Sequence, residues 1–147
     1  MILPNGDRVT KDTPIYIGSN FTWGEVTKNC KRHIQTLIID GRVIISANDI
    51  QDKIIATAKE LDSYRSLLGN RPLWVNSWYR PVDINRMVGG SKWSRHQYGD
   101  AVDIRSDYRS PQDIYRYLDK LHLSGGLGRY FSFTHIDFRG TIARWHG

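Results

Sequence analysis

The segment Ser94–Asp103, which reads SRHQYGDAVD, contains a histidine and an aspartate seven positions apart, His96 and Asp103. Imidazole nitrogen and carboxylate oxygen both bind zinc, and a catalytic zinc site uses three protein ligands with one position open for water. A spacing of seven is too long for one helical face, but it suits two ligands on either side of a turn, and Gly99 permits such a bend. The pair is therefore a candidate metal site, although two polar residues around an ordinary turn would give the same pattern.

Two small residues of the same segment leave room for a bound ion. Ala101 and Asp103 have the same parity on a short strand, so Ala101 would lie on the metal side without filling it. Ser94 lies two residues before His96 and offers a hydroxyl group to the same pocket. The segment could thus supply two ligands and one hydrogen-bonding group.

A third ligand is required, and His135 is the best candidate. It lies in the segment 131–139 (FSFTHIDFR), where strand alternation places His135 and Asp137 on one face and isoleucine and phenylalanine on the other. Taken alone, His135 is equally consistent with a structural histidine. The other histidines are weaker candidates, because we expect two near the surface and one is almost at the chain end: His33, His122 and His146.

These segments together resemble the zinc D-alanyl-D-alanine peptidase family, whose pattern Ser-x-His-x-x-Gly-x-Ala-x-Asp is complete in Ser94–Asp103. A preceding strand that ends Ser-x-Tyr-Arg matches Ser77–Arg80, and the histidine of a final strand matches His135. The branch with His-x-Asp-x-Arg-Gly and a terminal Ala-Arg-Trp is the most similar. The resemblance runs from about Leu73 to Trp145, half of the chain. The family includes D,D-carboxypeptidases, D-Ala-D-Ala dipeptidases and L-alanyl-D-glutamate endolysins.

The resemblance implies a hedgehog/DD-peptidase fold and a bound Zn²⁺ with His96, Asp103 and His135 as its ligands. It implies that Arg80 stabilises the developing oxyanion or binds the substrate carboxylate, and that Ser94 hydrogen-bonds the substrate. The implied reaction is hydrolysis of a D,D- or L,D-peptide bond in the stem or cross-link peptides of peptidoglycan, by metal-activated water.

The general base departs from the family pattern. Several members carry an acidic residue three positions before the final histidine, where this chain has Ser132. Asp137, on the same strand face as His135, is the candidate replacement, and it is equally a candidate to orient the imidazole of a ligand. His146 is a weaker candidate for the base, because terminal residues are often mobile. The missing acid leaves an alternative function open, a non-catalytic zinc-containing module that binds the cell wall on the same fold.

The amino-acid composition limits the classes of binding partner that we expect. With 21 Lys and Arg against 15 Asp and Glu, the formal net charge is +6, which favours an anionic partner such as the cell wall. No fingerprint of a nucleic-acid-binding fold is visible, so we expect no nucleic-acid partner. The single Cys30 excludes an internal disulfide, and no run approaches the ~20 apolar residues of a membrane span. We expect a monomer that acts at the cell wall, outside the cell, in the periplasm or delivered by a phage, although the N-terminus shows no signal peptide.

The helices and strands that we expect to position these residues indicate an α+β fold, a small antiparallel sheet flanked by helices. Patterning predicts a single domain over residues 1–147, with an irregular or hairpin-containing part in 1–45 and a catalytic core in 46–147. The expected elements are a capped helical turn near 22–26, a hairpin of 36–39 and 43–45, helices at 48–68 and 111–122, a helical turn between 80 and 90, and strands at 73–77 and 131–139.

Overall fold

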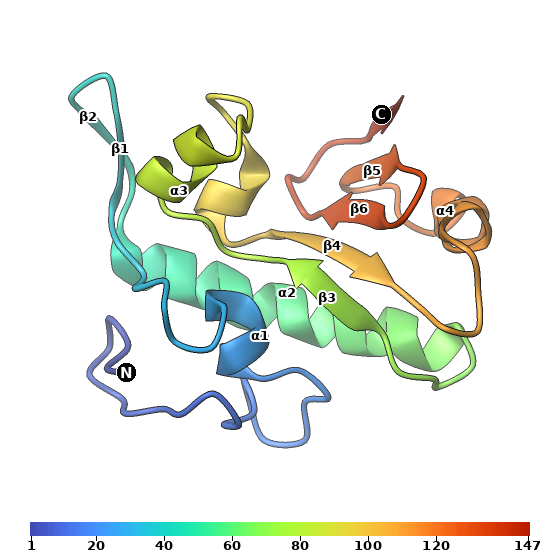
Figure 1. Cartoon of the computed structure of the whole chain (residues 1–147), viewed down its shortest axis with the longest axis horizontal. Helices are drawn as coiled ribbons and strands as arrows, with labels where there is room; N and C mark the ends of the chain where they lie inside the picture. Colours follow the sequence, from blue (N-terminus) through green and yellow to red (C-terminus); the bar gives the residue numbers. More distant parts are fainter.

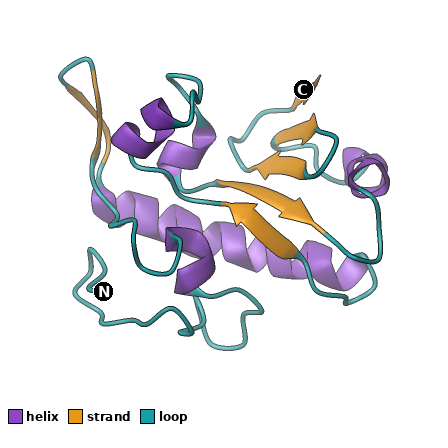
Figure 2. Ribbon diagram, viewed as in Figure 1, coloured by secondary structure: helices purple, strands orange, loops and turns teal.

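The computed structural model describes residues 1–147 and has the expected α+β architecture (Figures 1 and 2). Its α-helices are α1 (Trp23–Thr27), α2 (Ala47–Leu67), α3 (Val82–Met87) and α4 (Pro111–Asp119), and a 3-10 helix, η1, covers Arg95–Tyr98. Its strands are β1 (Leu37–Ile39), β2 (Arg42–Ile45), β3 (Trp74–Ser77), β4 (Ala101–Arg105), β5 (Gly126–Arg129), β6 (Thr134–Asp137) and β7 (Ala143–His146).

The central sheet has five strands in the order β3-β4-β6-β5-β7, and β1 and β2 form a separate hairpin. All neighbouring strands of the central sheet are antiparallel except β5 and β7, which are parallel. The register aligns one residue from each strand in a row across the whole sheet. This row consists of Ser77, Asp103, His135, Gly128 and Trp145.

The long helix α2 runs along the central sheet and supplies much of the core (Figure 1). Its fully buried stripe includes Ile50, Ile54, Ala58 and Leu61, as the helical periodicity predicts. The helix begins one residue earlier than expected, because Ser46 rather than Asn48 is the N-cap and accepts a hydrogen bond from the backbone of the third helical residue.

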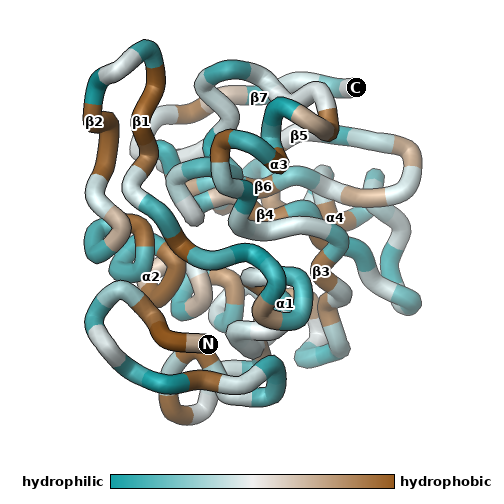
Figure 3. Tube along the Cα trace, turned by 60° about the vertical axis from the view of Figure 1, so that its left-hand side comes forward, coloured by the Kyte–Doolittle hydropathy of each residue, from teal (hydrophilic) through white to brown (hydrophobic).

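The N-terminal part packs into the same core as the sheet. Phe21 and Trp78 are buried and make an edge-to-face contact with ring centroids 5.9 Å apart. The expected capping box of α1 is present, with reciprocal hydrogen bonds between Thr22 and Glu25. The β1–β2 hairpin projects from the body, and its strands are strongly hydrophobic in Figure 3 although Ile38 is half exposed.

The C-terminal third differs most from the prediction. Helix α4 ends at Asp119 rather than at residue 122, and the expected strand 131–139 is only the four residues of β6. The strands β5 and β7 were not predicted. The glycine-rich segment before β6, expected only to end a helix, forms β5, because its residues are covered on both sides by β6 and β7. None of the helices is long and apolar enough to cross a membrane.

Candidate metal centre and its cleft

His96, Asp103 and His135 come together from η1, β4 and β6. Their ligand atoms all lie within 4.8 Å of one another, and all three residues are buried. Nδ1 of His135 is 3.0 Å from Oδ1 of Asp103, and Nε2 of His96 is 3.3 Å from Oδ2 of the same carboxylate. The two strand residues meet because they are directly opposite in the β4–β6 register.

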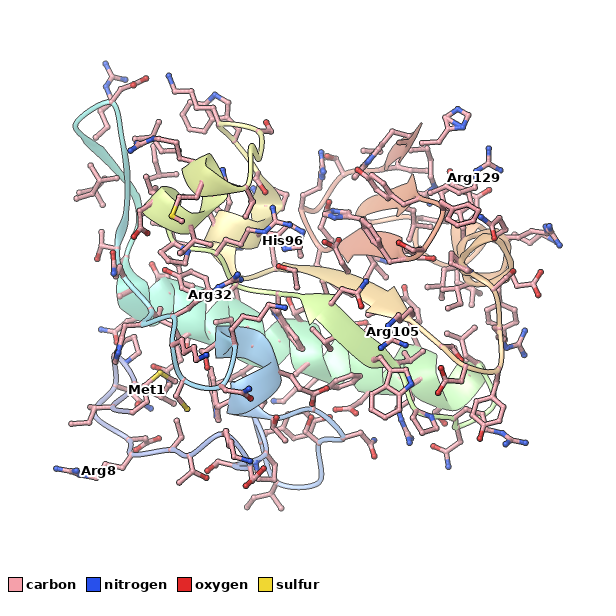
Figure 4. The ribbon with its side chains drawn as sticks, in the orientation of Figure 1. Met1, Arg8, Arg32, His96, Arg105 and Arg129 are labelled. Atoms are coloured by element: carbon pink, nitrogen blue, oxygen red, sulfur yellow. The ribbon has the colours of Figure 1, made fainter.

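The turn between η1 and β4 brings His96 to the edge of the sheet. Ser94 is the N-cap of η1, and its hydroxyl oxygen accepts a hydrogen bond from the backbone N–H of His96. Gly99 ends η1 with a φ of +81°, and a Cβ there would lie 2.7 Å from Cγ1 of Ile54 on α2. A glycine at this position therefore serves both the left-handed turn and the close approach to the helix. Figure 4 shows His96 above β4, between the η1 side and the β5–β6 side.

Each histidine has one ring nitrogen held by the protein and the other directed at Asp103. Nδ1 of His96 is 2.6 Å from the carbonyl oxygen of Trp78, and Nε2 of His135 is 2.8 Å from Oδ2 of Asp137. When the two imidazoles are neutral, as metal binding requires, acceptors in these positions favour the tautomers in which Nε2 of His96 and Nδ1 of His135 carry the lone pairs. Metal-binding histidines are usually oriented in this way.

The spacing and charge of the cluster suit a divalent metal ion. Tetrahedral zinc with bonds of about 2.1 Å separates its ligand atoms by roughly 3.4 Å, close to the two separations from Asp103. Burial alone would raise the pKa of Asp103, but hydrogen bonds from His135 and His96 hold it well below its usual range. The carboxylate is thus ionised and ready to bind a cation.

Asp137 lies behind His135 and is fully buried. Its Oδ1 accepts hydrogen bonds from the backbone N–H of Gly126 at 3.0 Å and from Nε of Arg139 at 2.8 Å, and Nη2 of Arg139 donates to its Oδ2 at 2.7 Å. Burial would raise the pKa of Asp137, but Arg139 and His135 hold it well below its usual range. Both oxygens are therefore engaged, on the side of the imidazole that faces away from Asp103.

Arg80 and Ser94 line the same cleft as the cluster. Nη2 of Arg80 is 3.5 Å from Oδ2 of Asp103, and its Nε donates to the hydroxyl of Ser77 at 3.2 Å. Burial lowers the pKa of Arg80, and the Asp103 carboxylate partly offsets this effect. Every residue that the sequence assigned to the site thus lies at the cleft, except that Asp137 is covered by His135 and Arg139.

The cleft has a volume of about 640 Å³ and combines arginine with aromatic side chains. Two of its arginines are already paired, since Arg95 contacts Asp100 through two hydrogen bonds and Arg139 contacts Asp137 in the same way. The aromatic residues of the lining come from the loop before η1, from the turn between β5 and β6, and from β7: Trp93, Tyr130, Phe133 and Trp145.

Two other histidine candidates and Ser132 lie outside the lining of the cleft. His122 is buried rather than near the surface, with Nε2 2.6 Å from the carbonyl oxygen of Asp137. His146 is exposed and contacts Arg129 at 2.9 Å, and it does not line the cleft. Ser132 is exposed and is also absent from the lining. Tyr130 was missed because its position depends on the unpredicted strands β5 and β7.

Comparison with known proteins identifies the family of the chain. Residues 14–137 match the sequence profile of a family described as Peptidase M15. The chain is also 28% identical over 105 residues to the zinc D-Ala-D-Ala carboxypeptidase of Streptomyces albus G, a match that covers 60% of this chain and 41% of that relative. The chain therefore spans about two fifths of the relative's length. The family match begins well before Leu73, where the recognisable motifs start.

Proposed function

The chain belongs to the peptidase M15 family, and from this premise we propose that it is a zinc-dependent peptidase. Its proposed substrate is a peptide bond in the stem or cross-link peptides of peptidoglycan. The observation that carries the proposal is the buried cluster of His96, Asp103 and His135, in which each imidazole has its second nitrogen held by a protein acceptor. When zinc is bound, it supplies Lewis-acid chemistry, lowering the pKa of a water ligand to about 7 and polarising a carbonyl group.

The residues around the cluster have separable proposed roles. Arg80 is the cleft arginine without a bidentate carboxylate partner, so its guanidinium can bind the oxyanion or the carboxylate of a substrate. The hydroxyl oxygen of Ser94 accepts from the backbone N–H of His96, and no protein acceptor pairs with the hydroxyl hydrogen, so that hydrogen can be donated to the substrate. One chain supplies all of these groups, which supports a monomer as the working form.

Of the two roles open to Asp137, the surroundings support orientation of His135. A general base must reach the proton that it removes, directly or through one water. Asp137 is fully buried, and both of its oxygens accept hydrogen bonds from His135, Arg139 or Gly126. We therefore propose that Asp137 fixes the tautomer and ring orientation of His135.

The proposed function is tested by mass spectrometry of purified peptidoglycan peptides after incubation with the protein. The name of the Streptomyces relative makes a pentapeptide stem ending in D-Ala-D-Ala the first substrate to test. Loss of one alanine would establish carboxypeptidase activity, and a cut elsewhere would identify another bond. His96→Ala should abolish the products, whereas the exposed His33→Ala should not.

A second candidate function is a zinc-containing module that binds the cell wall without cutting it. The observation in its favour is that Asp103 is the one carboxylate lining the cleft, because Ser132 replaces the usual acid and Asp137 is enclosed. Normal zinc binding and wall binding without any new peptide fragment would select this function and reject the peptidase. We propose the cell wall as the place of action in either case.

A further inference from the structure

We propose that Tyr130 is a catalytic residue whose hydroxyl group donates a hydrogen bond to the carbonyl oxygen of the scissile bond as negative charge develops there. The inference rests on the proposed peptidase function and concerns a residue outside the metal cluster. Tyr130 directly follows β5 and lines the cleft together with Arg80, His96 and His135. It thus lies on the wall of the cleft that the β5–β6 turn provides.

The hydroxyl group of Tyr130 can donate a hydrogen bond to a ligand. Its oxygen accepts a hydrogen bond from Nε1 of Trp145 at 3.0 Å, and no protein acceptor pairs with its hydrogen. Tyr130 is half-buried and lines the cleft, so this hydrogen can be donated to a ligand that enters there. Arg80 lines the same cleft as Tyr130. We infer that both donors can be directed at one substrate oxygen in this cleft.

Two aromatic neighbours, Phe133 and Trp145, hold the Tyr130 side chain in place. The Tyr130 ring stacks on Phe133 with centroids 4.5 Å apart and an interplanar angle of 11°. Trp145 contacts His135, with centroids 5.0 Å apart, and is opposite Gly128 in the sheet. A Cβ at position 128 would lie 2.5 Å from the indole, so only glycine leaves space for this tryptophan. Donors that are held in place before reaction stabilise developing charge most effectively.

The other cleft donors are less suited to this task. Both Arg95 and Arg139 are engaged by carboxylates through two hydrogen bonds each. Ser94 lies at the start of η1, the element that carries His96, whereas Tyr130 directly follows β5. Arg80 is thus the cleft arginine without a bidentate carboxylate partner, and we infer that it acts together with Tyr130 on the oxyanion.

The test compares Tyr130→Phe with Tyr108→Phe, an identical change at an exposed tyrosine that does not line the cleft. Removal of one oxyanion donor lowers kcat by roughly 10²–10³ in a well-studied hydrolase. We expect Tyr130→Phe to lower kcat about 100-fold, with KM within about threefold and zinc content unchanged. Tyr108→Phe should match the wild type in all three quantities.

A binding measurement keeps the inference separate from the proposed function. A phosphinate analogue of D-alanyl-D-alanine, with a tetrahedral anionic group in place of the amide, mimics the charge that Tyr130 would stabilise. Calorimetry should show that Tyr130→Phe weakens binding of this analogue at least tenfold, even if the wild type proved unable to turn over any wall peptide. Trp145→Phe, which removes the indole donor and part of the ring that contacts His135, should cause a smaller loss and serves if Tyr130→Phe fails to fold.

Two results would overturn the assignment of Tyr130. The first is a Tyr130→Phe variant with kcat and analogue affinity within about twofold of the wild type. The second is a variant that loses zinc in parallel with activity, because Tyr130 would then support only the structure of the metal centre. Absence of turnover in the wild type, with analogue binding still dependent on Tyr130, would contradict the peptidase proposal alone.

Discussion

At the scale of single residues, the site is a chain of hydrogen bonds that ends at a metal position. Arg139 holds Asp137, Asp137 holds Nε2 of His135, and Nδ1 of His135 faces Asp103. On the other side, the carbonyl of Trp78 holds His96. Groups that orient a metal ligand typically change metal affinity 10–100-fold when they are mutated.

The first prediction distinguishes orientation from base catalysis at Asp137. If Asp137 orients His135, Asp137→Asn should weaken zinc binding about 10–100-fold, and saturating zinc should restore most of the activity. If Asp137 were the base, activity at full zinc occupancy would stay roughly 10²–10⁴-fold low. Zinc titration with a competing chelator, combined with rates at saturating zinc, separates the two. Asp113→Asn, in an exposed Asp–Arg pair, is the matched control.

The second prediction concerns pH. Burial favours neutral His135, but Asp103 and Asp137 outweigh it and raise its pKa. The metal-free fold therefore gains stability from this proton below about pH 6.5, the ordinary histidine value, and loses it as pH rises through the raised pKa. Zinc must displace the proton, so the increase in Tm caused by a fixed free zinc concentration should be larger at pH 8 than at pH 6. An increase that is equal or larger at pH 6 would contradict this linkage.

At the scale of elements, the η1–β4 turn connects the metal ligands to the core of the protein. Gly99 has both a left-handed φ and a close contact with Ile54, whereas Gly41 in the β1–β2 hairpin has a φ of +75° and open space around it. These two glycines therefore share the backbone requirement and differ in the packing requirement. The comparison separates backbone strain from steric conflict.

The third prediction uses this pair. Gly41→Ala should cost about 1–2 kcal/mol of unfolding free energy from the left-handed backbone alone. Gly99→Ala should cost about 1–3 kcal/mol more, because the new methyl group collides with a packed helix. Only Gly99→Ala should also weaken zinc binding, since it displaces the turn that carries His96. Urea unfolding and zinc titration measure both effects, and equal destabilisation by the two variants would reject the packing argument.

How far the sequence could predict these elements depended on whether their signals were local. The stripe of α2, the capping box at Thr22 and the hairpin around Gly41 all follow from neighbouring residues, and the structure confirms them. The strands β5 and β7 did not follow, because a glycine-rich segment has weak strand propensity and its parallel partner lies some 17 residues away. The motif brought the three ligand candidates together, but it gave no signal for Tyr130 or for the burial of His122.

At the scale of the whole molecule, the chain has a formal net charge of +6, and the lining of the cleft contains three arginines. Peptidoglycan peptides carry carboxylates, so long-range attraction would raise their local concentration at the cleft. The N-terminal segments belong to the same structure, because Leu3, Val9 and Phe21 are buried in the common core. We therefore propose that residues 1–147 act as one domain.

The fourth prediction is that wall binding depends on salt. An inactive His96→Ala variant should bind purified peptidoglycan in a pull-down at about 0.05 M salt and be largely released at about 0.5 M, because screening shortens the range of charge attraction. Zinc content and folding of the variant can be checked in the same samples. Binding that does not change with salt would indicate that the net charge has no role in recognition.

The measurement that tests the central claim most directly is the zinc content of the purified protein, determined by elemental mass spectrometry for the wild type, His96→Ala and His33→Ala. A site with two imidazoles and one carboxylate predicts about one zinc per chain, retained in His33→Ala and lost in His96→Ala. A wild type that contains no zinc and binds none when it is supplied, or a His96→Ala variant that keeps a full equivalent, would contradict the assignment of His96, Asp103 and His135 as a metal centre.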